Sequence, residues 1–245
     1  MNKGKGVDVS RIDNLIINED VKTPIGEAYR TIRTNIQFSM PKGQLRTMLI
    51  TSTGPEEGKS TTTANVAITM AESGNRVLLI DADLRKSVVH KMFQLPNLKG
   101  LTNVLAEDLD YREVLRTTKV QGLDILTGGP KPPNPSELLG SEKMRTFLES
   151  LKKDYDIIIL DTPPVLPVTD AAILASQVDG VVIVSSYGHT TFDGLDRTKV
   201  QLENVGAKIL GVILNKVPTS KRGGHYYYYY YDGYNAPDKS ERTPK

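Results

Sequence analysis

The chain alternates between short apolar runs and longer stretches with helical periodicity. Apolar runs of strand length begin near residue 49 and then occupy residues 76–83, 123–126, 155–161, 180–185 and 208–214. Such nearly continuous runs are typical of strands that are buried on both faces of a sheet. Helical patterns occupy 60–73, 141–153 and part of 191–205, a short helix is expected at 111–116, and the proline-rich segment 128–139 is expected to be irregular. Strands that alternate with helices predict an α/β fold, with a parallel sheet covered by helices on both faces.

The residues before the first strand predict a further helix at 23–39. Thr23 and Pro24 supply a capping hydroxyl and a proline in the first turn. An apolar stripe follows at helical spacing, formed by Ile25, Tyr29, Ile32 and Ile36. Glu27 and Arg30 fall away from this stripe and Arg33 lies on its border. By spacing alone, these three charges are typical of a solvated helix face.

Composition narrows the range of functions. The length of 245 residues is enough for one domain with a sizeable core. The net charge of +2 is too small to favour nucleic acid as a partner. It contains no cysteine and three separated histidines, which excludes thiol chemistry and argues against a zinc site. The N-terminus lacks the apolar core of a signal peptide, and no apolar run approaches the ~20 residues of a membrane span. We therefore expect a cytoplasmic protein whose membrane association depends on a partner.

The first apolar run leads into STGPEEGKST, which has the layout of a phosphate-binding loop between a strand and a helix. Gly58 has no Cβ, so backbone N–H groups can approach a phosphate, and Lys59 adds a positive charge near the terminal phosphates. Ser60 offers a hydroxyl to Mg²⁺, and the helix directs its positive end at the ligand. The general pattern has its first glycine at the position of Thr53, whereas this chain has Gly54. The alternative is a glycine-rich turn that happens to precede a helix. Because such a loop is expected at the surface, Lys59→Met is predicted to leave thermal unfolding unchanged.

Acidic residues stand at the ends of two other predicted strands. Asp81 and Asp83 end one run and Asp161 ends another. Ligands bind at the carboxyl ends of parallel strands, so these acids are expected beside the phosphate loop. Carboxylates that face phosphates need a cation between them, and Mg²⁺ takes oxygen ligands. Such an acid can also cap a helix or form a salt bridge, and for Asp170 a capping role is a sufficient explanation.

The tail has a different composition from the rest of the chain. Seven of the eleven tyrosines lie within nine residues: Tyr226, Tyr227, Tyr228, Tyr229, Tyr230, Tyr231 and Tyr234. One interpretation is a flexible, low-complexity tail, and the other is a cluster of acceptor hydroxyls. The expected organisation is an N-terminal arm at 1–22, a P-loop domain at 23–217 and a disordered tail at 218–245.

These motifs together resemble the bacterial tyrosine kinases (BY-kinases) of capsule and exopolysaccharide systems, in the two-chain form of Gram-positive bacteria. The resemblance covers nearly the whole chain. It rests on the phosphate loop at 52–61, on LLIDADLR at 78–85, which is similar to the Walker A′ motif, and on IIILDTPP at 157–164, which is similar to Walker B. EAYRTIR at 27–33 and the tyrosine cluster add to it. The resemblance implies a P-loop NTPase-like fold, ATP and Mg²⁺ as cofactors, and a protein-tyrosine kinase that regulates polysaccharide synthesis and export.

The resemblance also implies a role for each matching residue. Lys59 would contact the phosphates, Asp83 would act as the base for the incoming tyrosine hydroxyl, and Arg85 would complete the catalytic set. The implied metal ligands are Ser60, Asp81 and Asp161. The implied nucleotide-binding residues are Gly54, Glu57, Gly58, Lys59, Ser60, Thr61 and Asn215, the last facing the adenine.

Further implications concern assembly. Glu27, Arg30 and Arg33 would form the interface of a homo-oligomeric ring, an octamer in the family, which reverses the interpretation from spacing. A separate transmembrane activator protein would recruit the chain to the inner face of the cell membrane. The tail tyrosines would be phosphorylated in trans, and proteins of polysaccharide synthesis would be further substrates.

Two other functions compete with this one. A switch ATPase of the MinD/ParA kind would hydrolyse ATP without phosphorylating protein, but its signature lysine is replaced here by Gly54, and the division-type members end in an amphipathic membrane helix that this tail does not resemble. A scaffold would use ATP structurally and the tyrosines as an adhesive. Incubation with γ-labelled ATP separates the three functions. Label on protein indicates a kinase, free phosphate alone indicates a switch ATPase, and neither product indicates a scaffold.

Overall fold

The computed structural model describes residues 15–16, 23–41 and 45–218. The expected arm at 1–22 lies mostly outside these residues, and the tyrosine cluster lies entirely outside them. The described part contains one seven-stranded sheet with the order β3-β4-β2-β5-β1-β6-β7. Its strands are β1 (Thr47–Ser52), β2 (Val77–Asp81), β3 (Arg116–Thr117), β4 (Leu123–Leu126), β5 (Ile157–Asp161), β6 (Gly180–Ser186) and β7 (Ile209–Asn215).

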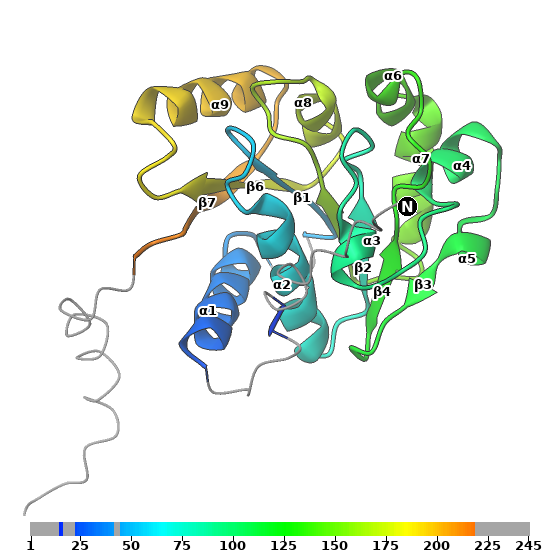
Figure 1. The fold of residues 1–245 in the computed structure, drawn as a ribbon, viewed down its shortest axis with the longest axis horizontal. Helices are drawn as coiled ribbons and strands as arrows, with labels where there is room; N and C mark the ends of the chain where they lie inside the picture. The colour runs from blue at the N-terminus through cyan, green and yellow to red at the C-terminus, as the bar shows by residue number, and fades with distance from the viewer. Residues whose placement is uncertain (1–14, 17–22, 42–44, 219–245) are drawn as a thin grey trace, which may run out of the picture.

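Helices cover both faces of this sheet (Figure 1). They are α1 (Pro24–Phe38), α2 (Lys59–Glu72), α3 (Val89–Met92), α4 (Leu101–Ala106), α5 (Tyr111–Val114), α6 (Pro135–Leu139), α7 (Glu142–Leu151), α8 (Asp170–Ala175) and α9 (Phe192–Asn204). Side chains of α1, α2 and α3 pack on one face, and side chains of α4 to α9 pack on the other. The predicted α/β fold with a covered parallel sheet is confirmed.

The central strands explain the apolar runs in the sequence. Neighbouring side chains of β1 alternate between the two cores, with Leu49 on one face and Met48 and Ile50 on the other, all fully buried. In a strand with one exposed face, every second residue can be polar. Here helices cover both faces, so nearly every position is apolar. Burial of each large aliphatic side chain contributes about 1.5–3 kcal/mol, so these strands hold the loops at their ends in place.

Three local features differ from expectation. Segment 128–139 is not wholly irregular, because α6 begins at Pro135, a residue type suited to the first turn of a helix. The two-residue strand β3, which pairs antiparallel with β4, is too short to leave a periodic signal. In α1 the predicted cap is confirmed, since Thr23 accepts a hydrogen bond from the N–H of Gly26. However, Ile25 is 55% exposed, whereas Tyr29, Ile32 and Ile36 of the predicted stripe pack on the core.

Within the described residues, no helix combines the length and apolar character needed to cross a membrane.

Candidate active site

The strand order brings the predicted site residues together. β5 lies between β2 and β1, and Asp161 of β5 is level with Asp81 of β2 and with Ile50 of β1. All three strands are parallel, so the loops that follow them leave the same edge of the sheet. The phosphate loop and the two acidic strand ends therefore meet, as the sequence predicted.

The phosphate loop requires glycine at position 58. Gly58 has a φ of +90°, and a Cβ there would lie 2.1 Å from Nδ2 of Asn215. That nitrogen donates a 3.0 Å hydrogen bond to the carbonyl oxygen of Glu57. The structure thus brings Asn215, at the end of β7, against the loop, although 158 positions separate the bonded residues. Its contact with adenine remains a prediction.

The Glu57 side chain shapes the loop. Its carboxylate is almost fully buried and accepts hydrogen bonds from the N–H groups of Thr53 and Gly54, at 3.1 and 3.2 Å. The hydroxyl of Thr190, in the loop after β6, donates to the same carboxylate at 2.9 Å. The Glu57 carboxylate is thus bonded within the protein, and contact of Glu57 with the nucleotide remains a prediction. Thr190 was missed because a lone threonine in a loop carries no sequence signal.

Lys59 lies between two acids. Its Nζ is 3.2 Å from Oδ2 of Asp83, 3.3 Å from Oδ1 of Asp161 and 3.0 Å from the hydroxyl of Ser60. Burial alone would lower the pKa of Lys59, but the charges of Asp161, Asp83 and Asp81 outweigh it and the pKa is raised. The loop reaches the surface at Pro55 and Glu56, as expected, but Lys59 itself is buried at 9% exposure, which the sequence did not predict. We call Lys59, Asp81, Asp83 and Asp161 the acidic centre.

The carboxylates of the acidic centre outnumber its cation by three to one. Burial, followed by the charge of Asp161, raises the pKa of Asp81 to about 7, and burial also raises the pKa of Asp161. Asp83 is buried and accepts a hydrogen bond from the N–H of Lys86 at 2.9 Å. A buried cluster with this excess of negative charge is stabilised by a further cation or by protons.

The side chains present fit a magnesium ion. Oδ1 of Asp81 is buried and has no hydrogen-bond partner among the described residues, which makes it an available ligand. The carboxylates of Asp81 and Asp161 and the hydroxyl of Ser60 are the hard oxygen donors that Mg²⁺ prefers. In the described part of the chain, no group of three or more His, Cys, Asp or Glu side chains could hold a metal ion. A magnesium ion here would therefore need oxygens from phosphate and water to complete its shell.

The first turn of α2 completes the site. Lys59 is the first residue of this 14-residue helix, followed by Ser60 and Thr61, both partly buried. The N–H groups at a helix start have no partner within the helix, and the helix dipole adds a partial positive charge. The predicted loop residues therefore lie where a phosphate is favoured.

Arg85 belongs to a different cluster. Its guanidinium donates to both carboxylate oxygens of Asp170, from Nε at 2.8 Å and from Nη2 at 2.9 Å. Ser136 donates to the same carboxylate at 2.7 Å and accepts from Arg85 at 2.9 Å. Two nitrogens of Arg85, Nε and Nη2, are bonded to Asp170, and its catalytic role remains a prediction. Asp170 makes no capping hydrogen bond to α8, so the capping explanation was wrong. We call Arg85, Ser136 and Asp170 the arginine clamp.

The charged residues of α1 make contacts within the chain. Glu27 pairs with Arg30 one turn later, and both side chains are partly exposed. Arg33 donates to the carbonyl oxygen of Thr69 in α2 at 3.1 Å. The Arg33 contact holds α1 against α2, whereas the Glu27–Arg30 pair lies within α1. An interface with another chain remains a prediction.

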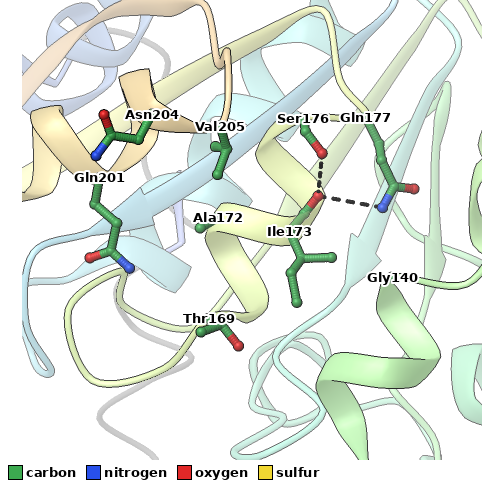
Figure 2. A pocket seen from close by; sticks show the side chains of 9 residues that line it. All are labelled: Gly140, Thr169, Ala172, Ile173, Ser176, Gln177, Gln201, Asn204 and Val205. Carbon is green, nitrogen blue, oxygen red and sulfur yellow. Dashed lines mark hydrogen bonds between the residues drawn. The ribbon is translucent and has the colours of Figure 1, made fainter.

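A groove between α8 and α9 is lined by no residue of the phosphate loop or of the acidic centre (Figure 2). Its volume is about 480 Å³, and its lining includes Thr169, Ile173 and Gln201 but no charged side chain. The carbonyl oxygen of Ile173 accepts hydrogen bonds from Ser176 and Gln177, so polar groups of its wall are already bonded to each other. Without a cation or a phosphate loop, this groove is not a site for a triphosphate.

Comparison with known proteins places the site in context. The family model of an AAA domain matches residues 54–212. The tyrosine-protein kinase YwqD of Bacillus subtilis is 43% identical over 221 residues, which are 90% of this chain and 92% of YwqD. The crystal structure of the chimerical protein CapA2B2 superposes with a TM-score of 0.81 at 40% identity, covering 84% of this chain and 91% of that one. The septum site-determining protein MinD of Pyrococcus horikoshii, complexed with Mg-ADP, is more distant, with a TM-score of 0.61, 26% identity and 73% of each chain covered.

Proposed function

This chain belongs to the bacterial tyrosine-protein kinases, and on that premise we propose that its acidic centre transfers the terminal phosphoryl group of ATP to tyrosine. The chain is a kinase by its family, and the MinD-like alternative is disfavoured because that relation is much more distant. The observation that carries the assignment of the site is the position of Lys59 between Asp83 and Asp161, at the start of α2. A single ammonium beside three carboxylates suits a ligand that brings both phosphates and a metal.

The loop and α2 bind and orient the nucleotide in this proposal. The backbone N–H groups around Gly58 and the first turn of α2 hold the phosphate oxygens. Lys59 places its ammonium against the terminal phosphates, and Asn215 lies at the loop edge where the base is expected. Ser60, Asp81 and Asp161 would hold Mg²⁺, which would neutralise phosphate charge during transfer.

Asp83 moves the proton. A tyrosine hydroxyl has a pKa near 10 and is a weak nucleophile at neutral pH. As its oxygen forms a bond to the γ-phosphorus, the bond from that phosphorus to the bridging oxygen of ADP breaks. The hydroxyl proton passes to the Asp83 carboxylate. The products are phosphotyrosine and ADP, and Asp83 releases its proton to solvent afterwards.

The acceptors and the assembly form the outer part of the proposal. The tail tyrosines, Tyr226 to Tyr231 and Tyr234, are the acceptors, phosphorylated in trans within a ring built through Glu27, Arg30 and Arg33. The ring is an octamer, and a transmembrane activator recruits it to the inner face of the membrane, where it regulates capsule or exopolysaccharide synthesis. Support comes from the motif resemblance and from the partly exposed Glu27–Arg30 pair, which a neighbouring chain could reach.

Incubation of the purified chain with γ-labelled ATP and Mg²⁺ tests the function. We expect acid-resistant label on tyrosine, lost in Lys59→Met and mostly lost on deletion of residues 225–245. Free phosphate without labelled protein would instead indicate a switch ATPase, and neither product would indicate a scaffold. Transfer in trans is tested by mixing a Lys59→Met chain with an active chain that lacks the tail. An unlabelled Lys59→Met tail would contradict it.

A further inference from the structure

The two carboxylate oxygens of Asp81 have different surroundings. Oδ2 accepts three hydrogen bonds, from the hydroxyl of Ser87 at 2.6 Å and from the N–H groups of Val88 and Val89 at 3.1 Å each. Oδ1 is buried and has no hydrogen-bond partner among the described residues. Three donors saturate Oδ2, so Oδ1 is the oxygen left for a cation.

The Ser87 hydroxyl also contacts His90. Nδ1 of His90 lies 3.1 Å from Oγ of Ser87. Ser87 has a single hydroxyl proton. When Asp81 is ionised, as a metal ligand must be, its carboxylate can only accept, and the 2.6 Å contact takes that proton. In that state Nδ1 of His90 carries the hydrogen and donates to Ser87. The three side chains form a chain of donors that runs from His90 through Ser87 to Asp81.

We propose that Ser87 is a positioning residue for magnesium, which holds the Asp81 carboxylate by Oδ2 so that Oδ1 faces the ion brought with the nucleotide. The inference rests on the proposed function. Hydrogen bonds from outer groups commonly orient metal-binding carboxylates, and their loss costs about 10–100-fold in metal affinity. Without Ser87, the carboxylate keeps two backbone donors but loses its shortest bond, and can rotate out of the orientation that presents Oδ1.

The arginine clamp supplies a matched control. Ser136 also donates a short hydrogen bond, 2.7 Å, to a fully buried aspartate, Asp170. Both oxygens of Asp170 are already bonded to Arg85, so neither is left for a cation. Ser136→Ala therefore removes the same chemical group from a similar environment without affecting a metal ligand.

The test is the affinity for ADP, measured by calorimetry with Mg²⁺ and again with EDTA. We expect Ser87→Ala to reduce the enhancement of ADP affinity by Mg²⁺ about tenfold and to leave the affinity in EDTA unchanged. Ser87→Thr keeps a hydroxyl and should retain most of the enhancement, and Ser136→Ala should retain all of it. His90→Leu, which removes the donor to Ser87 but not Ser87 itself, should give a smaller loss and provides a second variant should Ser87→Ala fold poorly.

Three outcomes would overturn the inference in distinguishable ways. In the first outcome, Mg²⁺ enhances the ADP affinity of the unmodified chain, and it enhances the affinity of Ser87→Ala and His90→Leu by the same factor. The positioning role is then wrong while the proposed function stands. An equal loss of affinity in Mg²⁺ and in EDTA would likewise make Ser87 merely structural. If the unmodified chain binds ADP without any effect of Mg²⁺, the metal site of the proposed function fails and the inference fails with it.

Discussion

The acidic centre and the arginine clamp are two buried acidic regions at the same edge of the sheet, and they are built differently. In the clamp, one carboxylate meets one guanidinium, and every oxygen of Asp170 has a donor. In the centre, three carboxylates share one ammonium, and Oδ1 of Asp81 has no donor among the described residues. Complete pairing indicates a structural role, and an excess of buried charge with an unused oxygen indicates a place for a ligand.

The pKa shifts follow the same division. Hydrogen bonding to Asp170 holds the pKa of Arg85 above its ordinary value, as expected for a balanced pair. In the centre, burial is the largest cause of the raised pKa of Asp81, and the charge of Asp161 adds to it. The centre therefore favours uptake of positive charge, whereas the clamp is already neutral.

Substitution of Lys59, the only cation of the acidic centre, should have the largest effect on tyrosine phosphorylation. We expect Lys59→Met to lower the rate of tyrosine phosphorylation by on the order of 1,000-fold, because the terminal phosphates lose their positive partner. It should also lower the melting temperature, since Asp83 and Asp161 lose a buried countercharge. Kinetics and thermal unfolding measure both. Lys86→Met is the control, since Lys86 is exposed on the loop after β2. A variant as active as the control would refute the site.

Disruption of the clamp should instead change stability. Asp170→Asn should reduce the free energy of unfolding by about 2 kcal/mol, less than for a fully buried pair because the Arg85 side chain is 36% exposed. The exposed Arg76–Asp156 pair supplies the control, and Asp156→Asn should cost less stability than Asp170→Asn. Urea denaturation measures both variants. Equal losses would show that burial of the clamp contributes nothing.

A smaller effect is expected from pH. The pKa of Asp81 is about 7 in the folded chain against 3.8 ordinarily, so between these values the folded state binds more protons than the unfolded state. Stability therefore decreases as pH rises from about 4 to 7. Other groups titrate in this range, so the prediction concerns a difference: Asp81→Asn should remove part of the decrease. Urea midpoints of the unmodified chain and of Asp81→Asn at pH 5 and pH 7.5 test this. An identical change of midpoint between the two pH values in both proteins would contradict it.

The sequence predicted what depends on local pattern. Continuous apolar runs identified the central strands, and the spacing of Gly58, Lys59 and Ser60 identified the loop. It was less informative where partners are distant in the chain. Arg85 was assigned to catalysis by the resemblance of LLIDADLR to the Walker A′ motif, and its pairing with Asp170, 85 positions away, left no signal in the sequence.

The burial of Lys59 shows the same limit. A phosphate loop was expected at the surface, but Lys59 turns inward because two strands deliver Asp83 and Asp161 to it. Ser87 and Thr190 were missed because single hydroxyls acquire a role only through the groups that the fold places beside them. Pairing between remote segments, which no local pattern records, decides these roles.

One measurement compares the two regions directly: ADP titrations with Mg²⁺ and with EDTA on Asp81→Asn and Asp170→Asn, alongside urea unfolding of each. Our account predicts opposite results for the two substitutions. Asp81→Asn should lose the enhancement of ADP affinity by Mg²⁺ while keeping or gaining stability at pH 7.5, and Asp170→Asn should lose stability while keeping the enhancement. If both variants lose the enhancement and stability together, or if Asp81→Asn keeps the full enhancement, the division into a ligand site and a structural clamp is wrong.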